Sequence, residues 1–146
     1  MESNFTFING EYIPFSQSSV HVSDLIVQRG YAVFDFFLVR DRVPRFLSFH
    51  LDRFIHSAAL LGLSLSYTKE ELSEIVSQLI GKNNIQNSSV KIILTGGFST
   101  DDFTLSPDKS TLILINKPFE VKWPAAWKNG ASLITAKYQR EVPEAK

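Results

Sequence analysis

Several short segments within the first 118 residues of the chain are dense in apolar, strand-favouring side chains, and this pattern predicts a sheet. Residues 31–39, 90–95 and 111–115 are rich in aromatic and β-branched side chains, which favours strands, the last two being central. Residues 5–15 predict two short strands around Asn9-Gly10, since both turn residues tolerate a positive φ. A charged turn over 40–42 then leads into a neighbouring strand over 43–47. The strands are expected to be mostly antiparallel.

Two other segments have apolar residues at the three- and four-residue spacing of an amphipathic helix. The first helix is expected to begin near Ser48, a favourable N-cap, and to end at Gly62. The second follows Thr68, which is spaced to form a capping box with Glu71, and is expected to stop over residues 81–84. The expected fold class is therefore α/β, of the α+β two-layer type, with two helices packed on a mostly antiparallel sheet.

The pattern changes after residue 118. Residues 119–130 contain Trp123, Pro124, Trp127 and Gly130 without a clear period, which is typical of a connection. Residues 131–137 predict a new strand. We therefore expect a small N-terminal α/β domain over 1–118, an interdomain linker over 119–130, and the first strand of a second, truncated domain over 131–146.

Composition narrows the functional classes. The 146 residues are 44% hydrophobic and 21% charged, enough for a globular core, and the formal net charge is zero. The absence of a basic excess argues against nucleic-acid binding. There is no cysteine, which excludes disulfides and thiolate metal sites. The first twenty residues lack the pattern of a signal peptide, and no apolar run approaches the ~18 residues of a membrane span. We expect a cytoplasmic protein that binds no membrane.

Few residues stand out as chemical groups. His50 and His56 have no common metal-ligand spacing, so no metal site is expected. Arg53 shares a helix face with His50 and Ser57, where its planar fork could hold a phosphate, and the alternative is a surface arginine paired with Asp52 or solvent. Lys146 could be a nucleophile or a solvated tail.

The glycine pair Gly96-Gly97 lacks the lysine of a phosphate loop and predicts a turn, and the adjacent acidic residues 101 and 102 predict a solvated loop.

Five motifs taken together resemble one enzyme family. They are Asn9-Gly-Glu11, Val22-Ser-Asp-Leu25, Arg29-Gly-Tyr-Ala-Val-Phe-Asp35, His50-Leu-Asp-Arg53 and Tyr138-Gln-Arg-Glu-Val-Pro-Glu-Ala-Lys146. Their order and spacing are similar to the amino-terminal half of fold-type IV pyridoxal-phosphate enzymes, which include branched-chain and D-amino-acid aminotransferases. The resemblance covers essentially the whole chain.

The resemblance implies a cofactor, pyridoxal 5′-phosphate, and a role for several residues. Arg53 matches the arginine that holds the cofactor phosphate, and Lys146 matches the lysine that binds the cofactor covalently and moves protons. Phe34 matches an aromatic residue on the substrate side, with Tyr31 and Phe36 as further wall residues. Arg140 matches an arginine that is structural or near the phosphate. The family also implies a homodimer acting on an amino acid and a 2-oxo acid.

The sequence also departs from the family. Some relatives place a carboxylate-binding arginine in the strand after the second helix, and Leu94-Thr-Gly-Gly-Phe98 has none, which puts a strict D-amino-acid or branched-chain specificity in doubt. Without a second domain, the fragment is expected to be inactive alone. A pyridoxal-phosphate lyase of the aminodeoxychorismate type is an alternative, and so is a non-catalytic interaction module that uses Trp123 and Trp127.

Overall fold

The computed structural model describes residues 4–101, 103–105, 109–120, 130, 132–139 and 144. Its elements, in chain order, are β1 (Phe5–Ile8), β2 (Glu11–Pro14), the 3-10 helix η1 (Phe15–Gln17), α1 (Leu25–Arg29), β3 (Ala32–Arg40), β4 (Val43–Pro44), α2 (Leu47–Leu60), α3 (Lys69–Asn83), β5 (Ser88–Thr95) and β6 (Leu112–Pro118).

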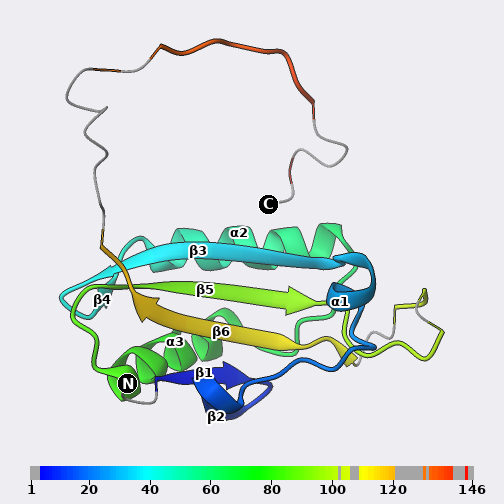
Figure 1. The fold of residues 1–146 in the computed structure, drawn as a ribbon, viewed down its shortest axis with the longest axis horizontal. Helices are drawn as coiled ribbons and strands as arrows, with labels where there is room; N and C mark the ends of the chain where they lie inside the picture. The colour runs from blue at the N-terminus through cyan, green and yellow to red at the C-terminus, as the bar shows by residue number, and fades with distance from the viewer. Residues whose placement is uncertain are drawn as a thin grey trace.

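The strands form one six-stranded sheet in the order β2-β1-β6-β5-β3-β4 (Figure 1). Every pairing of these strands is antiparallel. As expected, β5 and β6 are the central strands. The β1–β2 hairpin turns at Asn9 and Gly10, whose φ angles are 44° and 100°, so this turn is confirmed.

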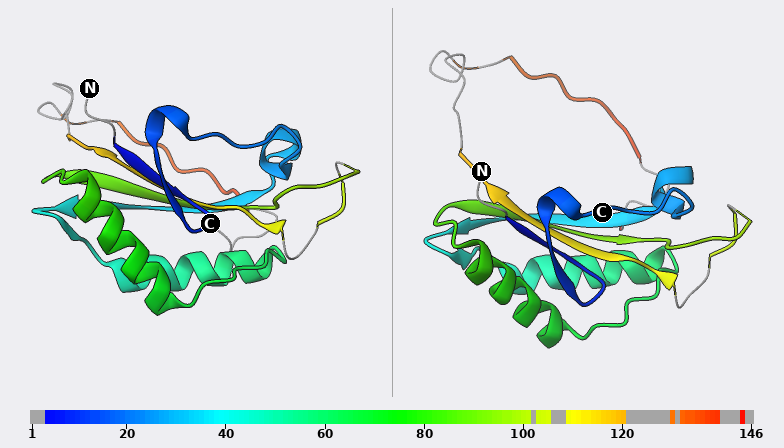
Figure 2. Two further views of the ribbon diagram at one scale, coloured as in Figure 1. Left: turned by 90° about the horizontal axis from the view of Figure 1, so that it is seen from below. Right: turned by 60° about the horizontal axis from the view of Figure 1, so that its bottom comes forward.

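Helices α2 and α3 cover one face of the sheet, as Figure 2 shows, and this confirms the two-layer α+β fold. The core lies between these layers, because alternate residues of each strand face the helices. Its buried side chains include Val33 and Phe37 of β3, Val90, Ile92 and Leu94 of β5, and Leu51, Phe54, Leu72, Val76 and Leu79 of the helices.

The two long helices differ in how well the sequence predicts their ends. The capping box of α3 is confirmed, since the Thr68 hydroxyl accepts from the Glu71 amide and the Glu71 carboxylate accepts from the Thr68 amide. The carboxylate's hydrogen bonds with Thr68 lower the pKa of Glu71 below its usual value. The helix continues through Gly81 to Asn83, and its C-cap Asn84 has a left-handed conformation, so α3 ends within the predicted range of 81–84.

The first long helix, α2, begins at Leu47, close to the predicted position, but the predicted N-cap residue was wrong. The N-cap of α2 is Phe46, which has a left-handed φ of 53° and no side-chain cap. Ser48 therefore lies inside the helix, where its hydroxyl accepts a hydrogen bond from Lys69. Strand β4 is correspondingly short and ends at Pro44 instead of 47.

Helix α1 was not predicted. Asp24 caps it by accepting from the Ile26 amide at 2.9 Å, and the same buried carboxylate accepts from the hydroxyls of Thr95 and Thr111. One carboxylate thus joins α1 to the end of β5 and to the start of β6.

The glycine pair is not a turn, contrary to the prediction. It is a point where two backbone segments pass closely, because a Cβ on Gly97 would lie 1.7 Å from the Lys109 carbonyl oxygen. The Gly97 carbonyl oxygen also accepts from the Leu25 amide at 3.0 Å, which fixes α1 against this crossing.

The strand expected over 131–137 is not formed by the described residues of that segment, 132–137, and Leu133 and Ile134 are almost fully exposed. The rest of the predicted linker, beyond residue 120, lies almost entirely outside the described residues.

Candidate active site

A carboxylate lies in the otherwise apolar core-facing side of β3. Residues 33, 35, 37 and 39 face the helices, and Asp35 is fully buried among them. An unpaired charge would be very costly there, so Asp35 requires cationic or hydrogen-bonding partners. Helix α2 supplies them from His50 and Arg53, which lie one turn apart on the helix face that meets β3.

Arg53 grips Asp35 with two hydrogen bonds. Its Nε donates to Oδ2 at 2.7 Å and its Nη2 donates to Oδ1 at 2.8 Å. The bidentate contact holds the guanidinium plane in one orientation. Hydrogen bonding to Asp35 raises the pKa of Arg53 above its usual value, so the group stays charged.

The far side of the same guanidinium faces outward. The Arg53 side chain is 45% exposed, while that of Asp35 is 0% exposed. Among the described residues, no hydrogen bond of the Arg53 Nη1 nitrogen is found. Arg53 is therefore fixed along one edge and keeps free donors along the other, which is the arrangement that an anion such as a phosphate requires.

His50 completes the cluster. Its Nδ1 lies 2.9 Å from Asp35 Oδ1 and 3.1 Å from Arg53 Nη2, and its ring packs against Phe37 at 5.2 Å between centroids. A carboxylate only accepts and a guanidinium only donates, so Nδ1 bonds to one or the other according to its tautomer. Either bond holds the imidazole beside the ion pair.

The alternative of a surface arginine paired with Asp52 does not hold. Asp52 pairs instead with Lys69 of α3, at 2.6 Å. Asp52 and Arg53 are neighbours in sequence but point in different directions from the helix, so their ionic partners lie on different elements.

The proposed aromatic wall residues separate into two groups. Phe34 and Phe36 lie on the face of β3 opposite Asp35, and their side chains are 45% and 37% exposed. Tyr31 packs against the core, and its hydroxyl donates to the Leu61 carbonyl oxygen at the end of α2. The structure thus brings Phe34 and Phe36 to one surface and directs the Tyr31 hydroxyl elsewhere.

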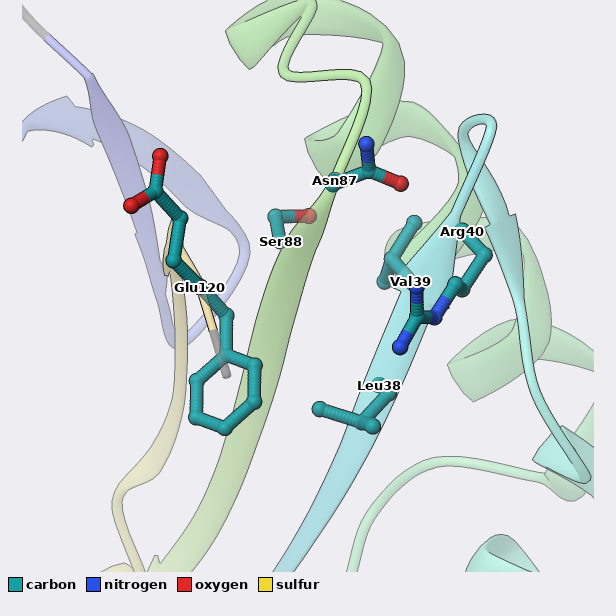
Figure 3. Close-up of a pocket in the computed structure, with 7 residues that line it drawn as sticks. Leu38, Val39, Arg40, Asn87, Ser88 and Glu120 are labelled. Carbon is teal, nitrogen blue, oxygen red and sulfur yellow. The ribbon is translucent and has the colours of Figure 1, made fainter. Parts of the chain in front are cut away.

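A pocket of about 410 Å³ lies at the far end of this surface (Figure 3). Leu38 and Phe119 contribute apolar side chains, and Arg40 and Glu120 stand on opposite sides of the opening. The Phe119 ring packs edge-on against Phe36, with 5.8 Å between centroids, so the pocket continues the aromatic surface of β3.

Two residues predicted to act at the site, Arg140 and Lys146, lie outside the described residues, as do Trp123 and Trp127. Their roles stay predictions. Asp35, by contrast, was part of a motif but was not singled out as a functional residue. The available signal was its position: it is an acidic residue at a core-facing position of a strand, followed by a helix with His50 and Arg53 on one face.

Comparison with known proteins identifies the family of the chain. The model of the amino-transferase class IV family matches residues 32–146, from the first residue of β3 onward. The chain belongs to this family. Among curated relatives of this class IV chain, the D-alanine aminotransferase of Staphylococcus epidermidis is 30% identical over 116 residues, covering 78% of the chain and 41% of the relative.

Two further comparisons concern the sequence and the fold. A putative branched-chain-amino-acid aminotransferase of Methanocaldococcus jannaschii is 28% identical over 137 residues, covering 92% of the chain and 46% of the relative. The fold is similar to that of the branched-chain aminotransferase from Thermoproteus uzoniensis with norvaline, with a TM-score of 0.70, 20% identity, and coverage of 81% of this chain and 41% of that one. The chain spans less than half of the length of these proteins.

The class IV chain has no described helix that is long and apolar enough to cross a membrane.

Proposed function

We propose that this class IV chain is part of a pyridoxal-phosphate-dependent enzyme that transfers an amino group between an amino acid and a 2-oxo acid. The observation that carries the proposal is the half-exposed Arg53 guanidinium, anchored on buried Asp35 with donors left facing outward. Such a group is suited to hold the cofactor phosphate, and the matched relatives are named aminotransferases.

The described residues fit the cofactor's phosphate end. Arg53 would bind the phosphate, while Asp35 and His50 keep the guanidinium in place. Pyridoxal phosphate supplies the electron sink that makes amino transfer feasible, and the protein supplies binding and orientation. A fixed phosphate would also hold the cofactor ring in one position, and this favours a single geometry for proton transfer.

Lys146 is the residue assigned to proton transfer in this proposal, by family resemblance. Its Nζ would hold the cofactor covalently, and as a free amine it would carry the proton removed from the substrate α-carbon. Arg140 remains a residue near the phosphate or a structural one.

Phe34 and Phe36 support an apolar substrate side. Both rings are partly exposed on one face of β3, so they can contact an apolar side chain and exclude water from it. Because the partly buried Tyr31 hydroxyl already bonds to Leu61, we assign Tyr31 a supporting role under this surface.

The proposal includes assembly and location. A homodimer, a cytoplasmic site of action and a second domain that begins near residue 131 are expected by family resemblance. The matched relatives extend well beyond the aligned region, which is consistent with a second domain. The aminodeoxychorismate-type lyase would use the same cofactor residues, but the named relatives favour amino transfer.

The test is Lys146→Ala in the complete protein. We expect the variant to lose the visible absorbance of bound cofactor and to lose turnover, because Nζ both holds the cofactor and moves the proton. Absorbance spectra with and without added amino acids measure both effects. A variant that still converts an amino acid and a 2-oxo acid at the unmodified rate would remove Lys146 from the mechanism.

A further inference from the structure

Two large apolar side chains are exposed at the start of α2. Phe46 and Phe49 are 73% and 74% exposed, whereas Phe54, further along the same helix, is buried. Phe46 is the N-cap and Phe49 belongs to the first turn, so both rings lie at the same end of the helix. Exposed aromatic rings grouped in this way are typical of a surface that contacts another protein.

The backbone conformation at position 46 disfavours a phenylalanine. Its φ of 53° is left-handed, which asparagine and glycine adopt with less strain, and no side-chain hydrogen bond caps the helix there. Strained residues of this kind are enriched where a structure has a functional use for them. The exposed Phe46 ring therefore requires an explanation outside the packing of its own chain.

A groove of about 410 Å³ lies next to the exposed rings, between the two helices that cover one face of the sheet (Figure 2). Leu47 and Leu51 of α2 contribute its apolar lining. Since Leu47 lies between Phe46 and Phe49 in the sequence, the groove and the rings belong to the same end of α2. This surface thus contains both apolar projections and an apolar hollow, which a self-complementary contact requires.

The charges beside the rings and in the groove have opposite signs. Arg45 is exposed and lies directly before the first ring, and no ion pair of its side chain with a described carboxylate is found. Glu70 and Glu74 of α3 are exposed, line the groove and have no cationic partner among the described residues. The neighbouring Lys69 is already paired with Asp52 at 2.6 Å. The cation beside the rings therefore complements the anions of the groove.

We propose that this surface binds a second copy of the chain. Phe46 and Phe49 of each copy enter the groove of the other. Arg45 of each copy then lies beside Glu70 and Glu74 of the other. Such a contact uses the same patch on both copies and closes with two-fold symmetry. Burial of the rings supplies the apolar driving force, and the charges at the rim fix the orientation.

The contact leaves the proposed cofactor site open. The groove lies on the α3 side of α2, whereas Arg53 bonds to Asp35 on the β3 side. Phe34 and Phe36 are separate from it as well, since they lie on the other face of the sheet. The contact can therefore add to the homodimer expected by family resemblance, and it does not depend on the proposed reaction.

The experiment measures the mass of the complete protein by light scattering after size-exclusion chromatography, over a range of concentrations. We expect Phe49→Ser to weaken association about hundredfold or more, because one ring is lost from each copy and the burial of each is worth about tenfold or more. Phe103→Ser is the matched control, since Phe103 is 72% exposed but lies beside Arg29, away from the long helices. Its association should equal that of the unmodified protein.

Phe46→Asn separates the contact from the stability of the chain. Asparagine tolerates the left-handed φ and is a favourable N-cap, so the variant should melt at an equal or higher temperature. The same variant should associate less strongly, because the exposed ring is gone. A structural role of Phe46 within its own chain would give the opposite result, with a lower melting temperature and unchanged association.

Charge reversal tests the pairing across the contact. Arg45→Glu and Glu74→Arg should each weaken association, and the two changes combined in one chain should restore most of it, because the opposite charges meet again. Restoration would not occur if either variant acted by disturbing its own fold.

Three outcomes would overturn the inference. The first is a mass of one chain for the unmodified protein at every concentration, and the second is equal association of Phe49→Ser and the unmodified protein. If Phe49→Ser lowers the melting temperature without a change in mass, another part of the same chain covers the rings. None of these measurements uses turnover or cofactor absorbance, so the proposed function is tested separately.

Discussion

The Asp35–Arg53 pair combines a structural role with the proposed phosphate-binding role in one contact. Asp35 is fully buried and needs a cation, whereas Arg53 is half-exposed and could be solvated without it. The two residues therefore respond differently to substitution. Removal of Arg53 leaves a buried carboxylate with His50 and the Phe36 amide as its neighbours, while removal of Asp35 releases an arginine that water can reach.

Arg53→Ala should weaken cofactor binding by about 1.5–3 kcal/mol, the scale of hydrogen bonds to a charged group. Arg53→Lys should recover only part of this loss, because an ammonium cannot bond to Asp35 and to a phosphate with a flat two-sided fork. Titration of the complete apoenzyme with pyridoxal phosphate measures the affinity.

Arg45→Ala is the control, since Arg45 is an exposed arginine just before α2. Equal cofactor affinity in Arg53→Ala and the unmodified enzyme would show that the outward edge of this guanidinium does not hold the phosphate.

From the sequence, a residue of the site could be predicted only where its relation to its neighbours is local. Arg53 was found because it lies three residues from His50 on a helix, a local relation. Its partner Asp35 is 18 residues away on a strand, and no local period connects the two. Pairing them requires knowledge that α2 packs on β3 with this face inward, which is a tertiary fact. The direction of the Tyr31 side chain likewise depends on a tertiary contact, because its hydroxyl donates to the carbonyl oxygen of Leu61, which is far away in the sequence.

At the scale of elements, the difference between local and tertiary contacts explains which helix boundaries could be predicted. The capping box of α3 uses Thr68 and Glu71, which satisfy each other's hydrogen bonds without help from the rest of the fold. The start of α2 depends instead on the left-handed conformation of Phe46, which propensity disfavours and which the turn out of β4 imposes. Helix α1 has only five residues, too few for a helical period. Asp24 caps it by accepting from the Ile26 amide, and hydroxyls of Thr95 in β5 and of Thr111 just before β6 donate to the same carboxylate.

Gly97→Ala should strongly destabilise the junction of these elements. Its φ of 72° costs an alanine about 1–2 kcal/mol, and the added Cβ would also overlap the Lys109 carbonyl. Gly62→Ala is the matched control, because Gly62 has a similar φ of 65° but no atom within 4 Å of the added Cβ. Urea unfolding of both variants measures the difference. Equal losses in the two variants would show that the close crossing at Gly97 relaxes without cost.

For the molecule as a whole, the alternation along the strands divides the sheet into a core-facing surface and an open surface, which is the proposed substrate side. Val33, Phe37, Ile92 and their neighbours face the helices and form the core, and Asp35 is the charged exception that links the core to Arg53. The opposite positions place Phe34 and Phe36 on the open surface. A shift of β3 by one residue would exchange the two sets, so the register fixes both stability and the proposed substrate surface.

This division predicts that stability and substrate binding can be changed separately. Leu72→Ala, at a fully buried position of α3, should lower the free energy of unfolding by about 2–5 kcal/mol and leave KM unchanged below the melting temperature. Phe34→Ala should cost only about 1 kcal/mol, since the ring is already 45% exposed, but should raise KM several-fold for substrates with apolar side chains. Urea unfolding and steady-state kinetics of the complete enzyme provide both readings. An unchanged KM in Phe34→Ala would place substrate away from the open surface, and a loss of stability equal to that of Leu72→Ala would show that Phe34 belongs to a packed interior.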